Sequence, residues 1–247
     1  EGGHLNPLKL ALGLAAAIER AGGRIHEQSQ ALSYREEGNG YVVTTGRGRV
    51  RADVLVLACN AYLDRLDPTL SSCVLPVGTY QVATAPLTEQ QASALLPSNV
   101  CVTDNQFVLD YFRRTPDNRL LFGGGCTYLG GMPRDIAAAT RPCLERVFPQ
   151  LKGVELEFAW GGHIDLTLKR TPDIGRRGDL YWLQGYSGHG VLPTLAGARA
   201  VSDAILGQPD ELALYQGLIN GSFPGGKYMA APLEAMGKAW YRLRDSL

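Results

Sequence analysis

The spacing of apolar residues predicts a strand, a glycine turn and a helix over residues 179–207. Leu180 to Leu183 form a short apolar and aromatic run typical of a buried strand, and the turn that follows contains three glycines. Apolar residues then recur at helical spacing from about Val191. We expect the packed face of this helix at Leu192, Leu195, Ala196, Ala200, Val201 and Ile205.

The first part of the chain predicts a helix followed by strands. Asn6-Pro7 is a favourable helix start, an apolar stripe follows it, and Gly22-Gly23 is suited to the helix end. A strand is expected at Arg24–Ile25, with extended chain over 26–34. Residues 53–58 are almost entirely apolar, which is typical of a buried strand in a parallel sheet.

The middle of the chain predicts a mostly antiparallel sheet. Between residues 74 and 122, runs of β-branched and aromatic residues alternate with Pro, Asn, Asp and Gly. Residues 115–118 form a strong turn signal, which predicts a hairpin of 111–114 with 119–123. A helix is expected at 141–148, and a second amphipathic helix near the C-terminus. The predicted divisions are 1–70, 71–166 and 167–247.

Composition narrows the class of protein. The 247 residues are 45% hydrophobic, and 24 basic side chains balance 24 acidic ones, so nothing favours a nucleic-acid partner. No apolar run approaches a membrane span, which predicts a soluble protein. The five cysteines lack C-x-x-C spacing, which favours reduced thiols in a cytoplasmic protein over disulfides or a zinc site.

The glycine turn has two interpretations on spacing alone. Its glycines are suited to leaving backbone N–H groups free at the positive end of a helix, where they would bind an anionic or carbonyl oxygen. They are equally suited to a plain connection between a strand and a helix. Nothing in the turn itself separates the two interpretations.

Several segments carry a family resemblance. GYSGHGVLPTLAGARAVSDAILG, GHLNPLKLALGLA, RADVLVLACNAYL and DYFRRTPDNRLLFGGG resemble the D-amino-acid-oxidase-like family of FAD-dependent amine oxidoreductases. Within it, the likeness to the gamma-glutamylputrescine oxidase group rests on GHLNPLKLALGLA, DYFRRTPDNRLLFGGG, GHIDLTLKRTPDIGR, LQGYSGHGVLPTLAG and the tail FPGGKYMAAPLEAMGKAWYRLRDSL. The resemblance implies an α/β (α+β) fold: a Rossmann-like FAD-binding domain, incomplete here, with an inserted antiparallel substrate-binding sheet. Residues 1–70 and 167–247 would belong to the first, and 71–166 to the second.

The same resemblance implies a cofactor site and a substrate site. Asn60 stands where relatives usually carry glycine, and asparagine tolerates positive φ. Cys59 is expected to be a small buried residue rather than a reactive thiol. His189 is either a hydrogen-bond donor to the flavin or exposed to solvent. The FAD-binding set implied is Ala31, Ala58, Cys59, Asn60, Gly185, Tyr186, Ser187, Gly188, His189, Gly190, Val191 and Leu192.

For the substrate, the resemblance points to Arg113 and His163. Arg113 and Arg114 alternate along one predicted strand, so only one of them can face a site, and each could equally be a solvated charge. A guanidinium is suited to a carboxylate because its planar fork donates two parallel hydrogen bonds. No residue is assigned as a general base, and no metal site is expected.

The implied reaction is oxidation of an amine C–N bond to an imine, then hydrolysis to an aldehyde, with oxygen reoxidising FAD. A G-x-G-x-x-G unit with its acidic partner is missing from this sequence, so an ADP-binding segment is expected to precede it. Two alternatives stay open: a deaminating amino-acid or sarcosine-like oxidase, and a non-catalytic module that keeps the flavoprotein scaffold.

Overall fold

We describe the protein from a computed structural model. The structure describes residues 3–98, 100–106, 108–127, 131–218, 220–224, 229, 232, 235–237 and 239–240. The chain forms two compact units, one of residues 1–4, 76–164 and 228–247, and the other of 5–75 and 165–227. The helix expected near the C-terminus lies mostly outside the described residues.

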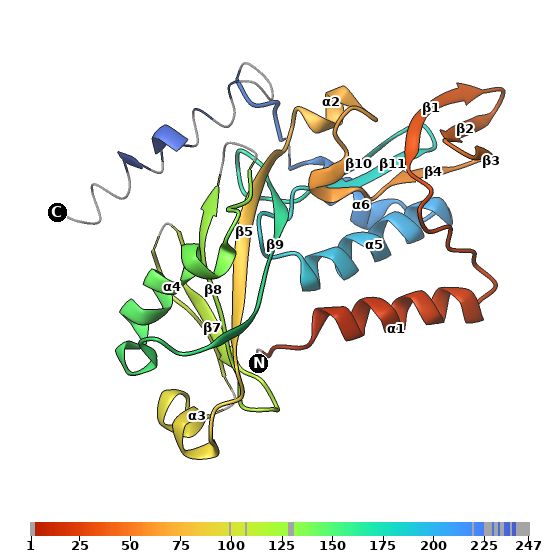
Figure 1. Ribbon diagram of the computed structural model, residues 1–247. Helices are drawn as coiled ribbons and strands as arrows, with labels where there is room; N and C mark the ends of the chain where they lie inside the picture. Colours follow the sequence, from red (N-terminus) through yellow and green to blue (C-terminus); the bar gives the residue numbers. More distant parts are fainter. Residues whose placement is uncertain are drawn as a thin grey trace. The chain divides into compact units, whose positions relative to one another are not determined.

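A small mixed sheet organises the unit that contains residues 5–75 and 165–227. Its strand order is β10 (Asp173–Arg177), β11 (Leu180–Gln184) and β4 (Leu55–Leu57). β11 runs parallel to β4, with Trp182 opposite Leu57, and antiparallel to β10. Helices α5 (Val191–Ile205) and α6 (Asp210–Gln216) pack on this sheet and on each other (Figure 1).

The packed face of α5 agrees with the expected one at Ala200 and Val201 and differs from it at Leu192, Leu195, Ala196 and Ile205, which are exposed. Its buried residues are small, namely Gly197, Ala200, Val201 and Ala204. Leu192 is 75% exposed and Leu195 is 43% exposed. The helix lies so close to the sheet that a Cβ on Gly197 would come 2.5 Å from Cδ1 of Ile174, and only small side chains fit such an approach.

Helix α1 (Pro7–Arg20) forms where the sequence predicts it. Asn6 caps it by accepting from the Lys9 N–H, and Gly22 follows its end with a φ of +86°. No residue of α1 is buried, however, and Leu8, Leu12 and Ile18 are 65%, 61% and 48% exposed. Leu10, Ala15 and Ala16 are half-buried, so the apolar residues of α1 are only partly covered within the described residues.

The rest of this unit contains a second sheet and two short helices. β1 (Ala31–Glu37), β2 (Gly40–Thr45) and β3 (Gly48–Ala52) form an antiparallel meander. The strand expected at Arg24–Ile25 is wrong, because those residues are irregular and the strand begins at Ala31. After β4 come the 3-10 turn η1 (Asn60–Tyr62) and α2 (Pro68–Ser71).

The buried carboxylate of Asp67 ties these pieces together. It caps α2 through the N–H groups of Thr69 and Leu70, and it accepts a 2.6 Å hydrogen bond from the Tyr34 hydroxyl. Arg177 lies 3.4 Å from it. Burial, together with the hydrogen bond to Asp67, raises the pKa of Tyr34 to about 12.

The other unit is built on a five-stranded sheet in the order β6-β7-β8-β5-β9 (Figure 1). The antiparallel hairpin expected around residues 115–118 is confirmed as β7 pairing with β8. Val82, Phe112 and Phe122 share one sheet face and pack with Leu144 and Phe148. The strands are β5 (Leu75–Thr84), β6 (Cys101–Thr103), β7 (Tyr111–Arg114), β8 (Leu120–Thr127) and β9 (Leu156–Leu166).

The helices of this unit are α3 (Glu89–Leu95), α4 (Ile136–Val147) and the 3-10 turn η2 (Pro149–Leu151). α4 begins earlier than the residue 141 expected, because Asp135 caps it through the Ala138 N–H. Pro142 therefore lies inside the helix rather than in its first turn. The expected mixed α/β class with antiparallel sheets is confirmed.

Candidate functional site

Two chain turns follow neighbouring parallel strands of the β10-β11-β4 sheet. β4 and β11 are parallel neighbours, so the residues that follow them leave the sheet at the same end. After β4 come Ala58, Cys59 and Asn60, and η1 packs against β11. After β11 comes the glycine turn 185–190. The carboxyl ends of parallel strands are the common ligand-binding edge of open α/β sheets.

The glycine turn has a backbone that only special residues adopt easily. Gly185, Ser187 and Gly188 have φ values of +78°, +52° and +87°. Gly185 is also needed for space, because a Cβ there would come 2.4 Å from Cγ2 of Thr167. The His189 N–H donates to the Tyr186 carbonyl at 3.0 Å, which closes the turn before α5 begins.

Asp165, near the end of β9, accepts hydrogen bonds from the backbone of the glycine turn. The buried carboxylate of Asp165 accepts from the N–H of Gly185 at 2.5 Å and from that of Tyr186 at 3.2 Å. The Asp165 carbonyl accepts from the Ser187 N–H at 2.9 Å. Burial raises the pKa of Asp165, and the two backbone donors oppose that rise.

The start of α5 presents backbone donors. Gly190 supplies no capping side chain, and Pro193 has no N–H, so the first turn of the helix offers the N–H groups of Val191 and Leu192. Their side chains are 49% and 75% exposed. The helix dipole adds a partial positive charge at this end. His189 is exposed, with Nδ1 3.4 Å from the Ser187 carbonyl oxygen.

Asn60 and Cys59 behave as two different kinds of residue. Asn60 has a φ of +51°, the left-handed conformation that glycine would adopt there, and its buried Oδ1 has no hydrogen-bond partner among the described residues. An orphaned buried acceptor just after β4 is consistent with a ligand that donates to it. Cys59 packs against the Tyr41 and Leu180 cluster, and burial raises the pKa of its thiol, which makes it poorly nucleophilic.

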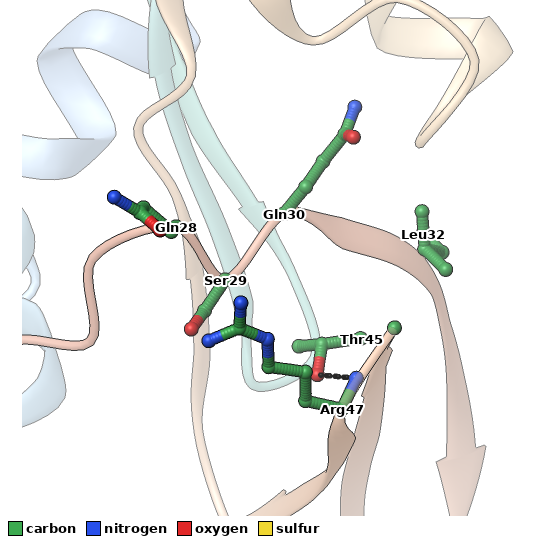
Figure 2. A pocket seen from close by; sticks show the side chains of 7 residues that line it. Gln28, Ser29, Gln30, Leu32, Thr45 and Arg47 are labelled. Carbon is green, nitrogen blue, oxygen red and sulfur yellow. Dashed lines mark hydrogen bonds between the residues drawn. The ribbon is translucent and has the colours of Figure 1, made fainter.

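Among the described residues, Ala31 lies in a different sheet from β4 and β11. It starts β1 and pairs with Thr45 in the separate three-stranded meander. Beside it lies a surface hollow of about 270 Å³, which the side chains of Arg47 and Ser29 help to line (Figure 2). The Arg47 N–H donates to Thr45 Oγ1 at 3.2 Å. The remaining residues that line the hollow are Gln28, Gln30, Leu32, Thr45 and Gly46.

Arg113 lies on the five-stranded sheet, on the face opposite the aromatic core. It pairs with Leu121 of β8, and its guanidinium is 3.2 Å from Nδ1 of His4. Tyr111 shares this face two residues earlier, and its ring lies over Gly123, where a Cβ would come within 2.1 Å of it. Burial raises the pKa of Tyr111, while hydrogen bonds with Gln81 and Thr79 lower it.

Two further arginines of this hairpin, Arg114 and Arg119, form ion pairs. Arg114 pairs with Glu89 and bonds Asn118 and Ser93. Arg119 pairs with Asp117 and Glu157 and lies 5.1 Å from the Phe158 ring centre. His163 lies in β9 and is half-buried.

The sequence analysis did not name three residues that lie at these sites: Tyr111, Gln81 and Asp165. Tyr111 and Gln81 share the Arg113 face, which alternation along β7 predicts for Tyr111. The only sequence signal for Asp165 is weaker: an acidic residue between the apolar residues Ile164 and Leu166 at the end of a strand. Among the described residues, no His, Cys, Asp or Glu cluster could hold a metal ion, and no helix could span a membrane. The five cysteines are all thiols.

Comparison with known proteins identifies a family of FAD-dependent oxidoreductases. The family model for FAD dependent oxidoreductases (DAO) matches residues 1–204. Gamma-glutamylputrescine oxidoreductase of Escherichia coli (strain K12) is 42% identical over 100% of this chain. A probable oxidoreductase, OrdL, of Rhizobium meliloti (strain 1021) is 36% identical over 98%. The chain spans 58% and 56% of the lengths of these two relatives.

Solved structures share the fold. Glycine oxidase from Geobacillus kaustophilus superposes with a TM-score of 0.64 at 26% identity, covering 78% of this chain and 52% of that one. L-proline dehydrogenase from P. horikoshii gives a TM-score of 0.66 at 21% identity, covering 81% and 55%. The family match, together with the relative at 42% identity, shows that this chain belongs to the family of FAD-dependent oxidoreductases of the DAO fold.

Proposed function

We propose that the protein oxidises the C–N bond of a primary amine resembling gamma-glutamylputrescine. The observation that carries the proposal is the parallel pairing of β4 with β11, because Asn60 and the glycine turn follow these two strands at the same end and the turn leads into the uncapped start of α5. The identity to the Escherichia coli gamma-glutamylputrescine oxidoreductase supports this substrate class. FAD, when bound, accepts a hydride from the carbon next to the nitrogen.

This chain's residues would bind and orient the flavin rather than perform the chemistry. The N–H groups of Val191 and Leu192 are suited to a carbonyl oxygen that gains negative charge, since they donate at the positive end of a helix. Asn60 Oδ1 would accept from a ring N–H. These roles, and those of Ala31, Ala58 and the rest of the turn, stay predictions.

Arg113 is the proposed substrate anchor. Its bidentate donors are suited to the carboxylate of a gamma-glutamyl group, and Tyr111 beside it has a partly buried hydroxyl. Arg113→Lys keeps the charge but loses the fork, so we expect the KM for gamma-glutamylputrescine to rise about tenfold, with kcat nearly unchanged. The control is Arg114→Lys, which alters a residue that pairs with Glu89. An equal effect of both variants contradicts the assignment. His163 stays a weaker prediction for the same site.

We also propose that an ADP-binding segment from outside this sequence completes the cofactor site. Three observations support it: the missing G-x-G-x-x-G, the spans of 58% and 56% of the relatives' lengths, and the exposure of Leu8, Leu12 and Ile18 on α1. Among the described residues β4 is also the edge strand of its sheet, and strand edges are normally paired or covered. Tight stoichiometric FAD binding by the 247-residue chain alone, measured by absorbance titration, would contradict the need.

The decisive experiment is anaerobic titration of the complete natural protein with candidate substrates. Bleaching of the flavin absorbance by gamma-glutamylputrescine, followed by recovery and peroxide formation when oxygen enters, is the expected result. Bleaching only by glycine or sarcosine would favour a deaminating amino-acid oxidase, an alternative supported by the glycine oxidase similarity. No bleaching by any amine would favour a non-catalytic flavoprotein. The cytoplasm stays our prediction for its location.

A further inference from the structure

Asp165 is one of the most deeply buried charged residues described, with 1% of its surface exposed. Burying a carboxylate is costly unless its oxygens accept hydrogen bonds. Here the two oxygens divide the work, Oδ2 accepting from Gly185 and Oδ1 from Tyr186. Both carboxylate oxygens therefore accept hydrogen bonds from the backbone of the glycine turn.

The contact is suited to a carboxylate and to few other groups. Two adjacent backbone N–H groups, from residues 20 and 21 positions further along the chain, need two acceptors on one planar group. An asparagine would offer one acceptor and turn an NH2 group toward the other N–H. The Ser187 N–H on the Asp165 carbonyl, and the Thr167 N–H 3.4 Å from Ser187 Oγ, extend the same attachment.

Asp173 is a nearby acid with a different task. Its carboxylate accepts from the side chains of Gln184 at 2.7 Å and Trp182 at 3.3 Å, both on β11. Burial raises its pKa as it does that of Asp165. Asp173 thus fixes strand side chains, whereas Asp165 fixes the turn backbone that precedes α5.

We propose that Asp165 is the positioning residue for the flavin: by holding Gly185 and Tyr186 it sets where the turn and the first N–H groups of α5 meet the cofactor. This inference rests on the proposed function, since it requires FAD to bind at this turn. Asp165 touches no flavin atom in this scheme and acts through the backbone it holds.

The test uses the complete natural flavoprotein with Asp165→Asn, Asp165→Glu and the matched control Asp173→Asn. Thermal unfolding reports the fold, reconstitution of apoprotein reports the Kd for FAD, and visible circular dichroism with the reduction potential reports how the flavin is held. We expect Asp165→Asn to raise the Kd at least tenfold and to change both flavin signals. Asp165→Glu keeps the charge but moves it, so it should fall between Asp165→Asn and the wild type.

Asp173→Asn should lower the unfolding temperature while leaving the Kd within threefold and the flavin signals unchanged. The inference is overturned if Asp165→Asn holds FAD like the wild type, or if both Asn variants lose affinity in proportion to lost stability. If Asp165→Asn does not fold, an unaltered Kd and spectrum in Asp165→Glu overturns it. A wild-type protein without FAD refutes the proposed function itself, and the inference with it.

Discussion

Replacing Gly185 by alanine tests the geometry of the glycine turn most directly. The residue has a φ of +78°, and a left-handed conformation costs an L-residue about 1–2 kcal/mol. The new Cβ would also lie 2.4 Å from Cγ2 of Thr167, a fully buried side chain, and 3.2 Å from the Asp173 nitrogen. Overpacking of this kind costs about 1–3 kcal/mol. We therefore expect Gly185→Ala to destabilise the protein by about 2–5 kcal/mol.

Thr167→Ser separates the two contributions. Serine removes the methyl group that the new Cβ meets and keeps the hydroxyl that donates to the Thr171 carbonyl at 2.8 Å. Alone it should cost about 1 kcal/mol, for one buried methyl. In Gly185→Ala/Thr167→Ser the steric part should disappear and the backbone part remain. The expected coupling is about 1–3 kcal/mol in the favourable direction.

The assay is urea unfolding of the complete protein at one fixed FAD concentration, with all four forms measured in parallel. Equal slopes in urea would show that the midpoints report stability rather than a change in the unfolded state. Strictly additive losses in the double variant would refute the steric argument. A Gly185→Ala variant as stable as the wild type would refute the backbone argument as well.

Three further predictions concern other parts of the chain. Tyr34→Phe removes the hydrogen bond to the Asp67 carboxylate and should lower the free energy of unfolding in urea by about 1.5–3 kcal/mol. Because the pKa of Tyr34 is raised from 10.0 to about 12, the stability linked to this group in the wild type should be complete below pH 10 and lost between pH 10 and 12. A Tyr34→Phe variant whose stability falls in the same way at alkaline pH would contradict this. Asn60→Gly keeps the positive φ and should stay within about 1 kcal/mol of the wild type, whereas Asn60→Ala should lose about 1–2 kcal/mol, and equal losses would show that the φ of +51° is unimportant. Leu144→Ala, at 0% exposure in the aromatic core, should cost about 2–5 kcal/mol, in contrast to the exposed Leu214→Ala, which is expected to change the urea midpoint little.

Local signals made the central part of the fold predictable. The strand, glycine turn and helix over 180–205 each depend on neighbouring residues, so spacing was enough to place β11 and α5. Asn60 was also predictable as a residue of positive φ, since asparagine commonly replaces glycine there. The family resemblance supplied the FAD assignment, which the residue pattern alone left open.

Tertiary contacts account for what the sequence did not predict. The prediction for the packed face of α5 was right at Ala200 and Val201 but wrong at Leu192 and Leu195, because close approach to Ile174 selects Gly197 and small neighbours. The role of Asp165 depends on partners twenty residues away, which no local pattern reveals. The strand expected at Arg24–Ile25 has β-favourable residues but no partner strand among the described residues, and propensity alone does not make a strand.

The exposed helix α1 gives a local reporter of assembly. A helix of 14 residues that buries no side chain has only its caps and its own propensity to hold it, which is marginal in water. Its amide hydrogens should therefore exchange with deuterated solvent within seconds unless something covers the stripe of Leu8, Leu12 and Ile18. Mass spectrometry of a peptide spanning α1 would then follow the docking of a covering surface, independently of any flavin signal. Slower exchange of the α1 amides in a longer protein than in this chain alone would show that a surface has docked on the helix, and samples taken at intervals would give the rate of docking.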